Sequence, residues 1–416
     1  MNATNKNRAA FGLKQGLAAA LTALCALVAA SCGGVGSGGT GDAVHGLSAG
    51  TTTGFGSVVV DGLAYADTQV SAMVEAQPNV LTPVTARLGQ FTEIEFESGA
   101  EQDSARAIRI DAAAVGQVEA VDVAGRAFTV LGQAVVENAV PDAGPVTFYS
   151  GTAGLEALVA GDAVEVHGVP RWNALSARYE VLATRIEKLP SLPSMRRLAG
   201  VVQNSVGGTG PGFMLGEMQI SYTASSTLPF GAVPRDGDRV IVWSDQPASA
   251  GGLVATAVRV VARSQPSMET AARLGGTVSR LDSGTSKRFD VAGVAVRYAD
   301  AVVTPQGPGF ALADGEYVLV DGTLATDGVL DARLVRIRKR GAPNYVEVEL
   351  TGPIENFVDA ASFTVRGTPV DAQGVSELQG CGNSALRDGL TVRVEGRVEA
   401  RATGSVVEAD VVRCVN

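Results

Sequence analysis

The chain has 416 residues, a formal net charge of −10, 51 glycines and a hydrophobic fraction of 46%. The hydrophobic fraction excludes a disordered chain, and the acidic balance argues against a general polyanion-binding protein. Abundant glycine and valine with few aromatic residues are typical of a β protein rich in turns.

Residues 1–31 have the features of an export signal. Three basic residues and no acidic one accompany an apolar run over 16–30, which is too short for a comfortable membrane span. The run ends in Ala29-Ala30-Ser31-Cys32, which resembles a bacterial lipobox, although Ala29 stands where that motif prefers leucine. We expect a lipid on Cys32; an ordinary signal peptide cut nearby, with Cys32 incidental, is the alternative.

The segment after Cys32 bears on where the chain goes. Residues 32–47 include the stretch GGVGSGGTG, which is typical of a flexible tether. Gly33 supplies no acidic retention signal. By resemblance to other lipoproteins, we therefore expect an outer-membrane lipoprotein that faces the periplasm or the cell surface.

One motif recurs through the rest of the chain: a glycine turn followed by alternating apolar and polar residues. This alternation is the pattern of a half-buried strand. Its copies start at Gly89, Gly161, Gly237, Gly315 and Gly389. Five copies indicate five similar units.

Three further landmarks accompany the turn motif. A Gly-x-Val opening starts at Gly50 (degenerate), Gly116, Gly200, Gly276 and Gly352. A Phe-x-Val strand ending in glycine starts at Phe128, Phe213, Phe289 and Phe363, and the first unit has Val58-Val-Val60 instead. A closing Ala-x-x-Val or Ala-x-x-Ile strand starts at Ala105, Ala183, Ala255, Ala332 and Ala409. We expect each phenylalanine to anchor a core.

The landmarks predict an all-β chain of five units with the order β-β-β-(short helix)-β-β. The segment Leu155-Glu-Ala-Leu158 is the expected helical turn of one unit. The predicted units span residues 48–112, 113–194, 195–267, 268–341 and 342–416. Five strands are too few for a seven-stranded sandwich but can close a small OB-like barrel. Short linkers predict a semi-rigid rod with contacts mostly between neighbouring units.

The combined pattern Gly-x-Val, Phe-x-Val-x-Gly, Gly-Asp-x-Val-x-Val-x-Gly and Ala-x-x-Ile resembles the bacterial domain-of-unknown-function family 5666 over residues 48–416. Gly161-Asp162, Gly237-Asp238 and Gly389 match the family's turn, whereas the first unit lacks the Asp and has Thr92 in place of the first valine. The resemblance implies an OB-like barrel and export. The family has no established activity, so no catalytic residue and no cofactor carries over.

The chain has two histidines, His45 in the glycine-rich lead-in and His167 on a strand. Because Val164 and Val166 of that strand should point inward, we expect His167 to face solvent. Neither histidine lies in a recognisable Ser/His/Asp context, so we expect no catalytic residues and no cofactor.

Acidic turns and cysteines are the next candidates. Asp236 and Asp238 have oxygens enough for calcium, but Asp-Gly is also what a tight turn selects, and we favour the turn and no metal. Once the signal segment is removed and Cys32 is lipidated, Cys381 and Cys414 remain. In an oxidising compartment these two should form a disulfide bond; a pair of buried free thiols is the alternative.

Two arginines and two tryptophans are weak ligand candidates. Arg336 and Arg338 share the outer face of a strand and could hold an anionic glycan or lipid headgroup, or merely solvate a barrel. Trp172 and Trp243 could stack on sugars or belong to a core. Export and the shortage of aromatic residues argue against nucleic acid as a partner.

These observations favour a non-enzymatic, envelope-anchored binding or spacer protein. Its expected partners are the membrane, through the N-terminal lipid, and an extended glycan or peptide. The alternative is a calcium-dependent accessory factor or hydrolase that uses the acidic turn residues.

Overall fold

The structure is a computed structural model that describes residues 45–68, 70–99, 101–208, 210–249, 252–261, 270–343, 345–375, 378–381 and 385–415. The expected signal segment and almost all of the tether therefore lie outside the described residues. Strands account for most of the described chain, with three short 3-10 helices. No helix among the described residues is long and apolar enough to cross a membrane.

The strands fall into five successive groups, here called repeats 1 to 5. Repeat 1 contains β1 (His45–Phe55), β2 (Val58–Val60), β3 (Leu63–Ala66), β4 (Ala72–Gln77), β5 (Val80–Val84), β6 (Phe91–Glu97) and β7 (Asp103–Ile110). Repeat 2 contains β8 (Ala114–Asp122), β9 (Ala127–Val130), β10 (Gln133–Glu137), η1 (Pro141–Ala143), β11 (Phe148–Ser150), η2 (Leu155–Ala157), β12 (Ala163–Asn173) and β13 (Arg178–Lys188). Repeat 3 contains β14 (Arg196–Val201), β15 (Gln203–Val206), β16 (Gly212–Leu215), β17 (Met218–Ser221), η3 (Ala224–Ser226), β18 (Thr227–Leu228), β19 (Arg239–Ser244), β20 (Leu253–Val254) and β21 (Ala257–Val260).

Repeats 4 and 5 complete the described chain. Repeat 4 contains β22 (Thr270–Thr277), β23 (Ser279–Asp282), β24 (Arg288–Val291), β25 (Val294–Arg297), β26 (Val302–Thr304), β27 (Tyr317–Leu324) and β28 (Leu330–Ile337). Repeat 5 contains β29 (Val348–Asp359), β30 (Ser362–Val365), β31 (Thr368–Asp371), β32 (Leu378–Gln379), β33 (Thr391–Arg401) and β34 (Gly404–Cys414).

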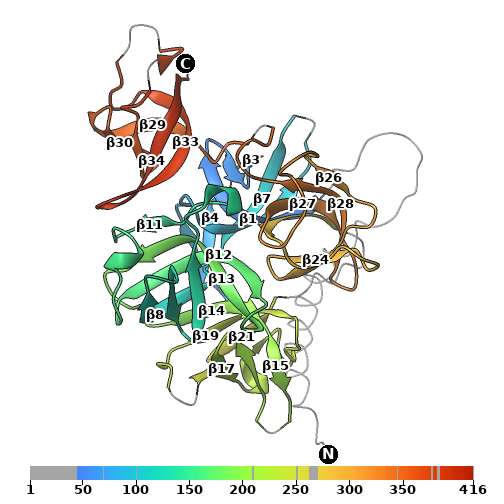
Figure 1. The fold of residues 1–416 in the computed structure, drawn as a ribbon. Coiled ribbons are helices and arrows are strands. Elements are labelled where there is room, and N and C mark those ends of the chain that lie inside the picture. Colours follow the sequence, from blue (N-terminus) through green and yellow to red (C-terminus); the bar gives the residue numbers. More distant parts are fainter. Residues whose placement is uncertain are drawn as a thin grey trace, which may run out of the picture. The chain divides into compact units, whose positions relative to one another are not determined.

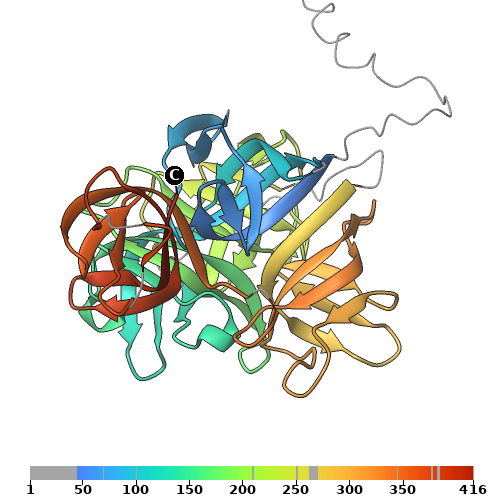
Figure 2. The same cartoon turned by 90° about the horizontal axis from the view of Figure 1, so that it is seen from above.

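Each repeat closes a small barrel, as repeat 5 illustrates. Its opening strand β29 pairs antiparallel with both β30 and β33. Strand β30 pairs with β31, β31 runs parallel to β34, and β34 returns antiparallel to β33. This is the order of a five-stranded OB-like barrel. Figures 1 and 2 show the strands of repeat 5, in red, curving around a common interior. The predicted all-β fold of small OB-like barrels is confirmed.

The recurring glycine turn has a backbone conformation that favours glycine. Its φ angle lies between +79° and +93° at Gly89, Gly161, Gly237, Gly315 and Gly389. The N–H of Gly389 donates to the carbonyl of Ile354 at 2.9 Å, and the N–H of Ile354 donates to the carbonyl of Leu390 at 2.9 Å. The same pair of bonds recurs in the other four repeats. The turn motif and the opening motif therefore occur together because two backbone hydrogen bonds join them in every repeat.

A β-bulge explains the glycine that follows the Val-x-Val of the turn motif and the alanine that starts the closing motif. In repeat 5 the register shifts between Glu395 and Gly396, and Gly396 then pairs with Ala409. A Cβ on Gly396 would lie 2.3 Å from the carbonyl oxygen of Glu408. The equivalent glycines of repeats 2 and 4 are as tightly placed, so these positions require small residues.

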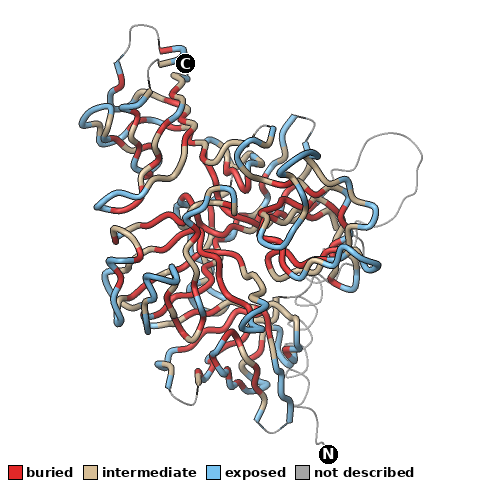
Figure 3. Tube along the Cα trace, viewed as in Figure 1, coloured by how far each residue is buried: buried red, intermediate tan, exposed pale blue. Residues whose placement is uncertain are grey.

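Clusters of buried apolar side chains fill the barrels, and Figure 3 shows the buried residues in red. The anchors Phe128, Phe213, Phe289 and Phe363 are at most 3% exposed, which confirms their expected place in the cores. Burying one such side chain contributes roughly 1.5–3 kcal/mol. The expected helical turn is also present as η2, with Leu155 buried.

Contacts between repeats do not follow the order of the chain. Strand β1 of repeat 1 pairs in parallel with β22 of repeat 4, and near its end with β29 of repeat 5. Repeats 2 and 3 join through β8 and β14. The expectation of contacts mostly between neighbours was therefore wrong. The physical reason is that residues 46–49 of β1 pair with β6 of repeat 1 along one edge only, so their other edge is free to pair with β22.

Candidate functional site

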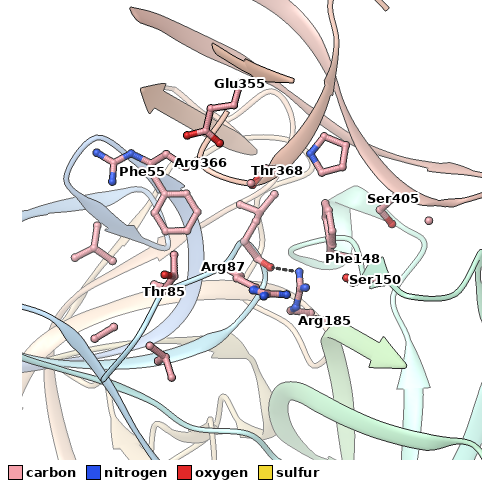
Figure 4. A pocket seen from close by; sticks show the side chains of 18 of the residues that line it. Phe55, Thr85, Arg87, Phe148, Ser150, Arg185, Glu355, Arg366, Thr368 and Ser405 are labelled. Atoms are coloured by element: carbon pink, nitrogen blue, oxygen red, sulfur yellow. Dashed lines mark hydrogen bonds between the residues drawn. The ribbon is translucent and has the colours of Figure 1, made fainter. Parts of the chain in front are cut away.

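A cleft of about 720 Å³ is lined by residues of repeats 1, 2 and 5. Figure 4 shows its labelled side chains, with Glu355 and Arg366 of repeat 5 on one side and Arg87 and Arg185 on another. Repeat 1 contributes its β5 end and the following loop, repeat 2 contributes β11 and part of β13, and repeat 5 contributes two hairpin turns. Three stretches far apart in the sequence thus form one concave surface.

Specific contacts fix the three walls. Thr184 Oγ1 of repeat 2 donates to the carbonyl of Gly89 in repeat 1 at 2.6 Å. Tyr149 of repeat 2 donates its N–H to Ser405 Oγ of repeat 5 at 2.8 Å. Gly54 of repeat 1 pairs with β29, and a Cβ there would lie 2.1 Å from a backbone oxygen of that strand. The backbone thus anchors each wall to the other two.

Two of the cleft's arginines share one carboxylate. Arg185 is buried, lies 5.2 Å from the centre of the Phe148 ring, and donates to Glu187 Oε2 at 2.8 Å. Its burial lowers the pKa of the guanidinium from its ordinary value. Arg87 is half exposed and pairs with Glu187 Oε1 at 3.1 Å. The charge of these two arginines is therefore partly neutralised by Glu187.

The third arginine, Arg366, extends from the turn between β30 and β31. Its Nε donates to the carbonyl of Thr351 at 2.9 Å, and the side chain is exposed. Two carboxylates, Asp67 and Glu355, also line the cleft. Apolar side chains such as those of Phe55 and Val84 also line it, and hydroxyl-bearing residues stand at Ser71, Thr85, Tyr149, Ser150, Thr368, Thr403 and Ser405. This wall can donate and accept many hydrogen bonds.

Trp243 is not exposed and so cannot stack on a sugar, which was one of the two roles considered for it from the sequence. Its side chain is fully buried, and its indole N–H donates to the carbonyl of Glu75 in repeat 1 at 3.3 Å. Arg197 and Arg259 lie 5.9 and 5.8 Å from the ring centre. The tryptophan belongs to a contact between repeats 1 and 3, which local sequence could not reveal. Trp172 is half-buried, packs edge-on against Tyr179 at 5.2 Å, and does not line the cleft.

Arg336 and Arg338 lie on β28 or just after it, away from the cleft. Arg338 lies 5.5 Å from the ring centre of Tyr345, and both arginines line a second hollow of about 230 Å³. The neighbouring residues Lys339 and Arg340 are paired with Glu316 and Glu347. The charges of these two neighbours are thus committed within the fold.

The acidic turn residues serve the fold. Asp236 Oδ1 accepts the backbone N–H of Ser205 at 2.7 Å, and Asp238 Oδ2 accepts that of Arg235 at 2.8 Å. Asp314 and Asp388 make the bond equivalent to that of Asp236 in repeats 4 and 5. The described residues contain no group of three or more potential metal ligands.

His167 does not face solvent, contrary to expectation. It is 1% exposed, its Nε2 lies 2.8 Å from Glu165 Oε1, and its Nδ1 lies 3.3 Å from the carbonyl of Asp111. The connection from repeat 1 covers the outer face of this strand. His167 therefore points away from its own barrel and is still buried. His45 is exposed at the start of β1.

The cysteines divide between the described and undescribed parts of the chain. Cys381 and Cys414 form a disulfide bond with a Cα–Cα distance of 4.9 Å. The bond ties the segment after β32 to the end of β34 within repeat 5. Cys32, the expected lipidation site, lies outside the described residues.

Comparison with known families fits this repeated barrel. The model of the domain of unknown function DUF5666 matches residues 115–187, 275–336 and 351–407. The chain is a protein of repeated DUF5666 domains. The matched segments correspond to repeats 2, 4 and 5, and two of these DUF5666 repeats contribute to the cleft.

Other comparisons add little about this DUF5666 protein. No curated protein matches the chain. Among solved structures, a chain described as "drosophila Unr CSD456" is similar, at 14% identity and a TM-score of 0.15, over 55% of this chain and 98% of that one. A similarity of this extent carries no argument about function.

Sequence reasoning missed the cleft of this DUF5666 protein because its walls come from three repeats. One signal was present. The turn after the second strand reads Val130-Leu131-Gly132 and Val291-Ala292-Gly293 in two repeats, but Val365-Arg366-Gly367 in the last. The counterpart in repeat 1 is the acidic residue Asp61, so Arg366 is the one basic residue at this turn position.

Proposed function

We propose that this DUF5666 protein is a non-enzymatic binding or spacer protein of the cell envelope that holds an extended glycan or peptide in the cleft. The observation that carries the proposal is the cleft itself, about 720 Å³ in volume, whose lining includes three arginines, two carboxylates and seven hydroxyl-bearing residues. A concave surface with convergent polar groups is the usual form of a ligand site. The proposed ligand is not a nucleic acid.

A tryptophan at Thr85 tests whether the cleft is the binding site. Thr85 is exposed and lines the cleft, so Thr85→Trp should fill it and lower retention of ligand on a glycan and peptide array by about tenfold or more. The matched control is Thr82→Trp, because Thr82 is exposed on β5, three residues before Thr85, but does not line the cleft. Equal retention by both variants and the wild type would place binding elsewhere.

The proposed location is the outer membrane, through a lipid on Cys32. The expected result is a mature chain that begins at Cys32 and carries the mass of a lipid anchor. Mass spectrometry of the mature N-terminus measures this directly. An unmodified N-terminus at another residue would remove the anchor from the proposal while leaving the cleft unaffected.

A further inference from the structure

We infer that the cleft binds acidic oligosaccharides, with Arg366 as the contact for a carboxylate of the ligand. This inference rests on the proposed binding function and specifies the ligand class.

In repeats 1, 2 and 4, another repeat covers the turn between the second and third strands. Residues Asp61, Leu131, Ala292 and Arg366 occupy the first position of this turn with φ of 49° to 50°, and each precedes a glycine with positive φ. Asp61 is 1% exposed and accepts a hydrogen bond from Tyr317 of repeat 4. Leu131 and Ala292 are 4% and 3% exposed within cores shared between repeats.

The turn of repeat 5 has no such cover. Arg366 and Gly367 are exposed, and no described heavy atom lies within 4 Å of where a Cβ of Gly367 would stand. The surface that other repeats use for packing is here open to the cleft. A position that elsewhere makes protein contacts is thus available to a ligand.

Arg366 is held in one orientation before any ligand arrives. Its aliphatic part lies across Gly352, where a Cβ would come 3.0 Å from Cγ, and its Nε donates to the carbonyl of Thr351 at 2.9 Å. No carboxylate of the described residues forms an ion pair with it at 4.0 Å or less. Its two terminal nitrogens can therefore donate a pair of parallel hydrogen bonds, the geometry that suits a carboxylate.

The remaining lining suits hydroxyl groups better than further negative charge. Asp67 and Glu355 are acceptors for sugar hydroxyls, and they would repel a phosphate with its larger charge. The serine and threonine side chains can donate and accept hydrogen bonds with the same hydroxyls. An oligosaccharide that carries a carboxylate therefore suits this cleft. Its carboxylate would pair with Arg366, and its hydroxyl groups would form hydrogen bonds with the neutral side chains of the lining.

The test measures binding by the chain from Gly33 onward of two probes: a galactose hexasaccharide in which one residue is galacturonic acid, and the same hexasaccharide with its single carboxyl group methyl-esterified. We expect the acid form to bind about tenfold or more tightly than the ester, because charge-assisted hydrogen bonds are the stronger kind. Arg366→Gln should remove that difference, and Arg366→Lys should restore part of it. Arg387→Gln is the matched control, since Arg387 is exposed in the same repeat but does not line the cleft.

Each outcome supports or overturns the inference. Equal affinity for acid and ester, an unchanged affinity of Arg366→Gln, or displacement of the acid by inorganic phosphate at similar concentration would overturn it. If arrayed neutral glycans bind, and Thr85→Trp but not Arg366→Gln removes that binding, the binding function stands and the acidic class fails. If neither probe binds and the array shows no ligand, both the class and the proposed function fail.

Discussion

Replacing Asp111 by alanine is expected to lower the free energy of unfolding by about 3–5 kcal/mol, the cost of leaving a buried charge unpaired. Asp111 connects repeats 1 and 2 and forms an ion pair with Arg197 of repeat 3, whose side chain is only 4% exposed. A second arginine, Arg239, lies 3.5 Å from Asp111 Oδ2. The Arg197 atoms Nε and Nη1 already lack a hydrogen-bond partner among the described residues. Without Asp111 the Arg197 guanidinium would keep its desolvation cost and lose its counter-ion.

Urea unfolding followed by tryptophan fluorescence measures this loss. Trp243 lies 5.9 Å from Arg197, so a Trp172→Phe background makes it the sole reporter of the affected region. Asp331→Ala is the matched control, because Asp331 pairs with Arg297 at the surface with its own side chain 51% exposed. Surface pairs contribute about 0–1 kcal/mol, so the control should change little. A loss of under 1 kcal/mol for Asp111→Ala would show that water reaches Arg197.

Replacing Asp61 by asparagine is expected to stabilise the protein at neutral pH by as much as about 3 kcal/mol. Asp61 is 1% exposed between repeats 1 and 4. Burial raises its pKa from 3.8 to about 6, although Arg338 and the Tyr317 hydroxyl, which donates to Oδ1 at 2.7 Å, oppose the shift. Ionised Asp61 is therefore costly above pH 6. Asparagine has the same shape without the charge, and the Tyr317 oxygen can accept from its amide.

The sign of the pH dependence distinguishes this cause from a packing effect. Because the folded pKa is raised, the folded state binds a proton that the unfolded state releases, and stability from this group is full below pH 3.8 and lost as pH rises through about 6. The advantage of Asp61→Asn should thus shrink as pH falls from 7 to 4. Urea unfolding of both proteins across that range measures it. An advantage that is constant with pH, or a loss at pH 7, would contradict the account.

Asp162 supplies a control of opposite sign. Its pKa is lowered, first by a hydrogen bond with Lys188, so its ionised form favours the folded state. Asp162→Asn should therefore reduce stability at neutral pH, and the reduction should diminish as pH falls. Both substitutions replace an aspartate carboxylate with an amide. They differ in the direction in which folding shifts the pKa of that aspartate.

The features predicted well from the sequence are those that each barrel specifies locally. The turn at Gly389 and the bulge at Gly396 depend on close backbone contacts within one repeat, and such contacts recur with the same residue types. The anchors such as Phe363 repeat for the same reason, since each barrel must fill its own interior. Period-2 alternation therefore sufficed for the fold class.

The features that the sequence could not predict arise between repeats. The pairing of β1 with β22 and β29 uses backbone groups, which carry no side-chain signature. The outward residues His167 and Trp243 are buried because a different repeat covers them. The cleft exists because repeat 5 contacts repeats 1 and 2, and its residues are ordinary polar residues in each repeat taken alone.

Hydrogen exchange of the chain from Gly33 onward, with and without the hexasaccharide that carries one galacturonic acid residue, tests whether repeats 1, 2 and 5 share one ligand site. We predict that the ligand slows exchange together at three separate stretches, residues 84–88, 148–151 and 366–369, one from each wall of the cleft. Unchanged exchange at all three, or protection confined to another surface such as the turn around Asp236, would contradict a ligand site shared by repeats 1, 2 and 5.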